Sequence, residues 1–141
     1  MTVIVVRDGV MACDTGVFSG GRICGHTRKW AAVPEHKGGG FVASAGNLGE
    51  AQDFIRAMSS DRTDSLPEAE AAIWLRGDGV VLERYGDGEW MQYDAPFYVI
   101  GSGESVAHGA LMAGASAAEA VRICTEVCTE CAGGPEIAGD G

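Results

Sequence analysis

The order of the expected elements predicts an α+β chain in which two antiparallel sheets stack and helices cover their outer faces, a four-layer αββα sandwich. Short apolar runs bounded by turn signals fill the first 45 residues and the stretch 72–100, a pattern typical of antiparallel strands. One helical pattern, at 49–58, separates the two groups of strands. Two more helical patterns, at 105–113 and 117–128, follow them.

The first group of strands begins almost at the N-terminus. Asp8-Gly9 is a short hairpin signal between two apolar runs, so these runs are expected to pair. Glycines break the segment 16–23, and proline stops a later short run. The strands are expected at 1–7, 10–14, 31–33 and 41–45.

The helix at 49–58 is expected to bury one stripe, because Ala51, Phe54, Ile55 and Met58 recur at helical spacing. A polar connector, 59–65, follows it. Residues 66–70 are expected to add a helical turn capped by Ser65, with Pro67 in its first turn.

The second group of strands is a meander whose turns carry Asp-Gly, with strands expected at 72–75, 80–85, 89–93 and 97–100. Ser116 and Glu119 form a capping box at the start of the last helix. Its buried face is expected to consist of Val121, Cys124, Val127 and Cys128, and an edge strand is expected at 136–138.

Three residues that can take part in catalysis, Thr2, Asp14 and Lys29, fall within the first thirty positions. Removal of Met1 would give Thr2 a free α-amine within reach of its own hydroxyl, a nucleophile that carries its base. The hairpin at Asp8-Gly9 brings Asp14 back beside Thr2, and the segment 16–23 is long enough to return Lys29 there. We therefore expect the Lys29 ammonium within a few Å of both Thr2 Oγ and an Asp14 oxygen.

Five motifs follow one another along the chain: Thr2-Val3-Ile4-Val5-Val6-Arg7, Ala12-Cys13-Asp14, Arg28-Lys29-Trp30, Ser44-Ala45-Gly46 and Tyr98-Val99-Ile100-Gly101-Ser102-Gly103. Together they resemble the proteasome β-type subunits and the bacterial protease HslV, which are N-terminal nucleophile hydrolases. The likeness covers about residues 2–56 and 97–134, and the order of the motifs makes it specific.

The resemblance implies a role for each matching residue. Thr2 would supply the nucleophilic Oγ and the basic amine, and Lys29 would keep that amine neutral and steady negative charge on Oγ. Asp14 would pair with Lys29, the Gly46 N–H would face the oxyanion, and Ser102 would hydrogen-bond around the nucleophile. The catalytic set is thus Thr2, Asp14, Lys29, Gly46 and Ser102.

The sequence departs from the family in two places. The family carries Asp-x-x-Ser-Gly-Gly where this chain has Thr129-Glu130-Cys131-Ala132-Gly133-Gly134, so Ala132 replaces the serine and no aspartate is in register. The family's long second helix is also missing. We therefore expect a thin helical layer on that side, and the ring stoichiometry of the family does not carry over.

Two functions stay open. The first is a threonine peptidase that cleaves peptides or unfolded proteins inside a homo-oligomeric assembly, with an ATPase unfoldase as a further partner that the resemblance leaves open. The second is a catalytically silent scaffold subunit of the same fold. A third interpretation, a cluster held by Cys124, Cys128 and Cys131, rests on spacing alone; packed thiols without metal are the expectation, as for Cys13 and Cys24.

Composition narrows the class of protein. The chain has 141 residues, enough for one domain over 1–141 with a substantial core, and carries a net charge of −10, which disfavours nucleic-acid phosphates as partners. No apolar run reaches membrane-spanning length and no signal peptide is visible, so a soluble, cytoplasmic protein is expected. The three histidines lack metal-ligand spacing, and no cofactor is expected.

Overall fold

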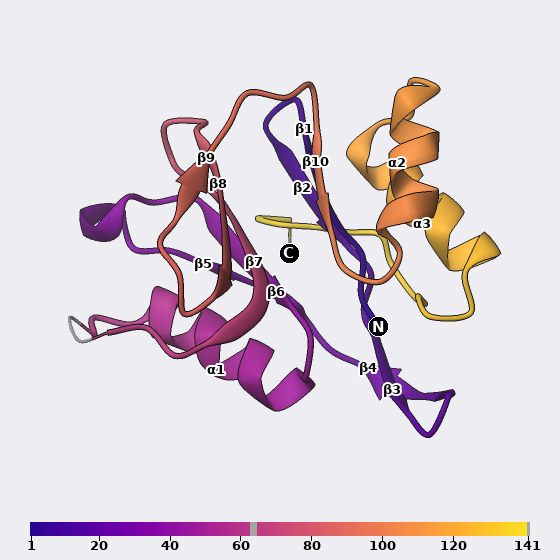
Figure 1. Ribbon diagram of the computed structural model, residues 1–141, viewed down its shortest axis with the longest axis horizontal. Coiled ribbons are helices and arrows are strands. Elements are labelled where there is room, and N and C mark those ends of the chain that lie inside the picture. The colour runs from indigo at the N-terminus through magenta and orange to yellow at the C-terminus, as the bar shows by residue number, and fades with distance from the viewer. Residues whose placement is uncertain (63–64, 141) are drawn as a thin grey trace.

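The strands of the computed structural model, which describes residues 1–62 and 65–140, form two main sheets and one separate hairpin (Figure 1). The four-stranded sheet has the order β10-β1-β2-β11 and consists of β10 (Tyr98–Ile100), β1 (Ile4–Arg7), β2 (Val10–Cys13) and β11 (Glu136–Ile137). The five-stranded sheet follows chain order and consists of β5 (Trp30–Ala32), β6 (Phe41–Ala45), β7 (Ala69–Leu75), β8 (Val81–Gly86) and β9 (Met91–Gln92). Every pairing is antiparallel, as the sequence predicts.

The helices lie on opposite sides of the molecule. Helix α1 (Leu48–Ser59) packs on the five-stranded sheet, whereas α2 (Glu104–Met112) and α3 (Ala117–Val127) lie beside the four-stranded sheet (Figure 1). A short 3₁₀ helix, Glu35–Lys37, joins β5 to β6. Among the described residues, no helix is long and apolar enough to cross a membrane.

Alternation along the strands divides the core into three parts. One apolar cluster combines the inner faces of both sheets, with Ile4 and Val6 of β1 packed near Ile73 of β7. Val3 and Val5, which alternate with Ile4 and Val6 along the chain, belong to a second cluster, shared with α2 and α3. A third cluster joins the other face of the five-stranded sheet to α1.

Helices α1 and α3 each begin after a residue whose side chain caps the first turn. The Asn47 side chain accepts a hydrogen bond from the Glu50 N–H at the start of α1. Ser116 and Glu119 form the expected capping box of α3, and both hydrogen bonds are 3.1 Å long. Each bond satisfies a backbone donor that the helix leaves unpaired.

The predicted helical turn at 66–70 is wrong. Residues 65–68 have no regular structure, and β7 starts already at Ala69, three residues before the predicted strand. The added length is stabilised on both edges, because Ala71 pairs with Ala45 of β6 and Ala69 with Gly86 of β8. Two residues of the polar connector, 63 and 64, lie outside the described part of the chain.

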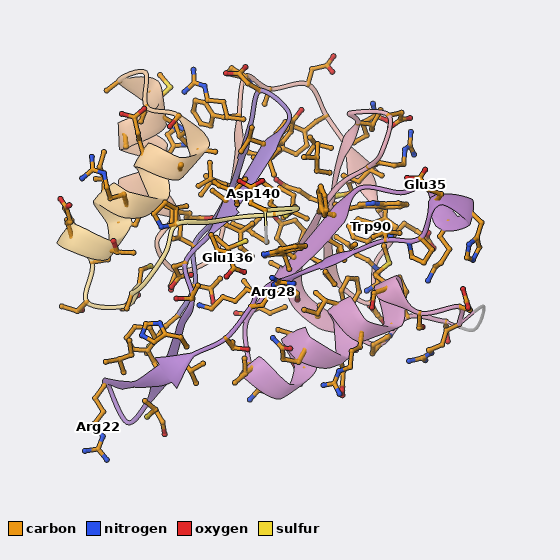
Figure 2. All side chains as sticks on the ribbon, turned by 180° about the vertical axis from the view of Figure 1, so that it is seen from behind. Arg22, Arg28, Glu35, Trp90, Glu136 and Asp140 are labelled. Atoms are coloured by element: carbon orange, nitrogen blue, oxygen red, sulfur yellow. The ribbon has the colours of Figure 1, made fainter. Side chains whose placement is uncertain are left out.

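Two expected burials are also wrong. Cys24 is exposed because it belongs to the hairpin β3 (Gly16–Ser19) and β4 (Arg22–His26), whose strands pair with each other and project from the body with Arg22 at the tip (Figure 2). The segment 16–23, which glycines interrupt, therefore belongs to a projecting hairpin that leaves Cys24 exposed. Val127 is 64% exposed, since it forms the last residue of α3, although Val121 and Cys124 are buried as expected.

One glycine fixes how closely the end of β10 approaches the N-terminus. Gly101 has φ +103°, and a Cβ there would overlap the Thr2 carbonyl oxygen and lie 2.8 Å from the carbonyl carbon. Gly114 has nearly the same φ, +104°, with no atom within 4 Å of an added Cβ. Both positions therefore require a positive φ, which favours glycine, but only Gly114 has free space for a side chain.

We predict that Gly114→Ala lowers the free energy of unfolding by about 1–3 kcal/mol, the cost of the unfavourable φ alone. Gly101→Ala should cost about 1–3 kcal/mol more, because overpacking adds to the same backbone cost. Urea denaturation of both variants measures the difference. Equal destabilisation would show that the close approach of Gly101 to Thr2 is not a constraint.

Candidate active site

Thr2 lies just before β1, in contact with the side chain of Lys29. The Lys29 Nζ donates hydrogen bonds to Thr2 Oγ1 at 3.1 Å, to Asp14 Oδ1 at 3.0 Å and to the Met1 carbonyl at 3.1 Å. Thr2 and Lys29 are each 5% exposed, and Asp14 is fully buried. The contact of Lys29 with both Thr2 and Asp14, expected from the hairpin geometry, is thus present. All three ammonium protons have acceptors.

Asp14 follows β2 and is held by more than its ion pair with Lys29. Its Oδ1 accepts the Val3 N–H at 3.0 Å, and its Oδ2 accepts the Ala132 N–H at 3.2 Å. The Ala132 carbonyl in turn accepts the N–H groups of Thr15 and Gly16 at 3.0 and 2.8 Å. The segment that departs from the family motif therefore contacts Asp14 through its backbone, which does not require a serine side chain.

The residues on both sides of Lys29 are anchored on Glu136 of β11. Arg28 and Glu136 lie close together in Figure 2. The Trp30 indole N–H donates to Glu136 Oε1 at 2.6 Å, and the Arg28 Nε lies 3.4 Å from the same oxygen. The Arg28 guanidinium also stacks over the Trp30 ring at 4.2 Å. Sequence reasoning missed Glu136; the one signal was Trp30 itself, since a buried indole needs a hydrogen-bond acceptor.

Ser102 lies where β10 ends, beside the backbone of Thr2. Its Oγ accepts the Thr2 N–H at 3.0 Å, and the Gly103 N–H donates to the Thr2 carbonyl at 3.2 Å. The Thr2 nitrogen is the atom that would become the α-amine if Met1 were removed. Ser102 thus contacts the atom on which an N-terminal nucleophile depends.

Thr2 borders two cavities that share Gly46. One, of about 370 Å³, is lined by Lys29, Phe18 and Leu48; the other, of about 460 Å³, is lined by Ser102, Glu70 and Tyr85. Gly46 has φ +120°, and an added Cβ would lie 2.6 Å from Glu70 Oε2. A side chain at position 46 would therefore be strained and would crowd the wall of the site.

The cysteines near the site are not suited to nucleophilic chemistry. Burial raises the pKa of Cys131 to about 12 and that of Cys124 to about 11, and it raises the pKa of Cys13 further. These thiols stay protonated at neutral pH, whereas a reactive cysteine needs a lowered pKa. Within 1–62 and 65–140, no group of three or more His, Cys, Asp or Glu side chains is placed to hold a metal ion.

We predict that Asp14→Asn lowers the free energy of unfolding by about 3–5 kcal/mol, because it leaves the buried Lys29 ammonium without its counter-charge. Adding Lys29→Met should recover part of this loss, since the double variant removes both charges. Urea denaturation measures both. Asp78→Asn is the control, because the Arg76–Asp78 ion pair lies at the surface and should matter little. Full stability of Asp14→Asn alone would contradict the ion-pair account.

Comparisons with known proteins identify the fold. The structure matches a eukaryotic HslV from Trypanosoma brucei with a TM-score of 0.67 and 20% identity over 96% of each chain. It also matches the bacterial proteasome homologue BPH of Thiobacillus denitrificans, alone (TM-score 0.64, 18% identity) and in complex with epoxomicin (TM-score 0.63, 16% identity), over 96% of this chain and 95% of that one.

No protein-family model matches the sequence, and no curated protein sequence matches it significantly. The resemblance to proteasome β-type subunits and HslV, drawn from scattered motifs, is nevertheless confirmed at the level of the fold. Nearly the whole chain has the fold of HslV and of the bacterial proteasome homologue.

Proposed function

We propose that this chain is an N-terminal threonine hydrolase that cleaves peptide bonds with Thr2 after removal of Met1. The observation that carries the proposal is the Lys29 ammonium, buried and shared between Thr2 Oγ1 and Asp14 Oδ1 at 3.1 and 3.0 Å. A buried cation beside a hydroxyl stabilises negative charge that develops on its oxygen. The fold likeness to HslV supports the same reaction class.

The freed α-amine of Thr2 acts as the general base. It takes the Oγ proton while Oγ attacks the carbonyl carbon of the substrate, directly or through a water molecule. The Lys29 ammonium disfavours protonation of the amine and steadies the forming alkoxide. The Ser102 Oγ, 3.0 Å from the Thr2 nitrogen, holds the amine in place.

The tetrahedral intermediate then collapses to an ester. Its oxyanion faces the Gly46 N–H, the leaving amine takes the proton from the Thr2 amine, and the acyl group stays on Oγ. Water hydrolyses the ester with the same amine as base, which restores Thr2. Asp14 does not exchange protons in this scheme; it fixes Lys29.

Met1 blocks this chemistry while it is attached. The Thr2 nitrogen is then an amide without basic character, and the Met1 carbonyl occupies one hydrogen bond of Lys29 at 3.1 Å. Met1 itself is 49% exposed, whereas Thr2 is 5% exposed and both polar groups of the peptide bond between them are hydrogen-bonded within the protein. The proposal extends to the four-layer sandwich architecture and to a homo-oligomeric assembly that acts on peptides or unfolded protein.

A catalytically silent scaffold is the second candidate. It is favoured by Ala132, which provides no hydroxyl at the place where the family has a serine. The two candidates differ in turnover and in the state of the N-terminus, and both are measurable on the same preparation.

We predict that protein lacking Met1 hydrolyses fluorogenic peptides, and that Thr2→Ala loses all measurable turnover while staying folded. Lys29→Ala should lower turnover by on the order of 10²–10³-fold, because Oγ loses its stabilising cation. Release of the fluorophore and intact-protein mass measure activity and Met1 content together.

Lys37→Ala is the matched control for the loss of a lysine. Its Nζ also donates to three carbonyls, those of Ala57, Met58 and Ser60, but at the end of α1 and away from Thr2. Turnover should survive this change. Hydrolysis that persists in Thr2→Ala would refute Thr2 as the nucleophile, and no hydrolysis by protein shown to lack Met1 would favour the scaffold.

A further inference from the structure

A cavity of about 740 Å³ lies between α2 and the segment from β8 to β10, next to the candidate site. Its aromatic lining consists of Tyr85, Tyr93, Phe97 and Tyr98, and its acidic lining of Glu83 and Glu104. His108 completes one wall and meets Phe97 edge-on, with ring centroids 5.1 Å apart. No lysine or arginine lines this cavity within the described residues.

Glu83 is a buried carboxylate without a cationic partner. It is 4% exposed, and its two oxygens accept the Tyr93 and Tyr85 hydroxyls at 2.7 and 2.8 Å. Burial, followed by the hydrogen bond to Glu83, raises the pKa of both tyrosines, so they stay protonated donors at neutral pH. In the described part of the chain no ion pair involves Glu83, although buried carboxylates are generally paired.

Two arginines near this cavity, Arg84 and Arg7, are engaged elsewhere. Arg84 donates to the carbonyls of Pro67 and Gly86 and lies over the Phe54 ring of α1, on the opposite side of β8 from Glu83. Arg7 lies 5.4 Å from the Phe97 ring centroid, but its Nη1 is bound by the carbonyls of Leu111 and Ala115. The negative charge of the cavity is therefore left for a ligand.

The cavity adjoins the nucleophile. Tyr85 and Glu104 also line the 460 Å³ cavity that contains Thr2 and Ser102, and Glu70 adds a third carboxylate there. Among the described residues, no carboxylate side chain lines the 370 Å³ cavity on Thr2, which is bordered by Val17, Phe18 and Leu48. The two sides of Thr2 thus differ in charge.

We infer that the 740 and 460 Å³ cavities together form an acidic aromatic subsite that takes a lysine or arginine side chain of the substrate peptide. Carboxylates of Glu83 and Glu104 attract the cation, and the tyrosine side chains that line the cavity supply aromatic surface for the cation and its methylene stem. The inference rests on the proposed function, because the basic side chain belongs to the substrate peptide that the proposed peptidase would bind. It deepens that function by giving the peptidase a preference for basic residues on one side of Thr2.

Binding to the Thr2→Ala variant tests the subsite without turnover. Alanine-based hexapeptides carry a single arginine, or its uncharged isostere citrulline, at each position in turn, and dissociation constants are measured by calorimetry. We expect at least about tenfold tighter binding of arginine than of citrulline at one position. Glu104→Gln, an exposed change, and Glu83→Gln should each reduce this ratio to about threefold or less.

Glu126→Gln is the control for loss of a negative charge, because Glu126 is an exposed residue of α3 that lines neither cavity. A ratio near one at every position, absence of binding by all peptides, or a ratio unchanged in Glu104→Gln would each overturn the subsite. Hydrolysis by the unmutated chain without an arginine preference would do so too and leave the proposed function standing. An arginine preference in a chain that hydrolyses nothing would refute the peptidase and support the subsite.

Discussion

The buried ion pair between Lys29 and Asp14 is the interaction on which the rest of the N-terminal structure depends. Removing two charges from water is costly, and the cost is offset only if every remaining donor and acceptor is satisfied. The Thr2 hydroxyl and Met1 carbonyl satisfy the ammonium, while the Val3 and Ala132 amides satisfy the carboxylate. Four chain segments must therefore meet at one point, and the hydroxyl of Thr2 is placed there as a consequence.

The supporting contacts come from the far end of the chain. Ala132 contacts the residues that follow β2, and β11 pairs with β2 through Glu136 opposite Cys13. Glu136 also binds both neighbours of Lys29. Gly101 permits β10 to approach the Thr2 carbonyl, and Ser102 then reaches the Thr2 nitrogen. The C-terminal segment and β10 thus position the first residues of the chain, which a terminus does not achieve by itself.

Local chemistry accounts for the parts that the sequence predicts well. Asp-Gly turns and apolar alternation predict the hairpins, the capping box predicts the start of α3, and hairpin geometry predicts the meeting of Thr2, Asp14 and Lys29. The failures concern long-range packing. Exposure of Cys24 and Val127 depends on which elements extend beyond the sheets. Trp30, which binds Glu136, and Tyr93, which binds Glu83, come from other segments that no local pattern indicates.

Localising an acyl group on the chain tests the central claim most directly. Protein that lacks Met1 would be incubated with a peptide β-lactone, whose ring opens on an attacking hydroxyl to give an ester, and then digested and mapped by mass spectrometry. The account predicts one adduct per chain, on Thr2, absent from chains that retain Met1 and formed on the order of 10²–10³-fold more slowly in Lys29→Ala. An adduct on another residue, or equal labelling of chains with and without Met1, would contradict it.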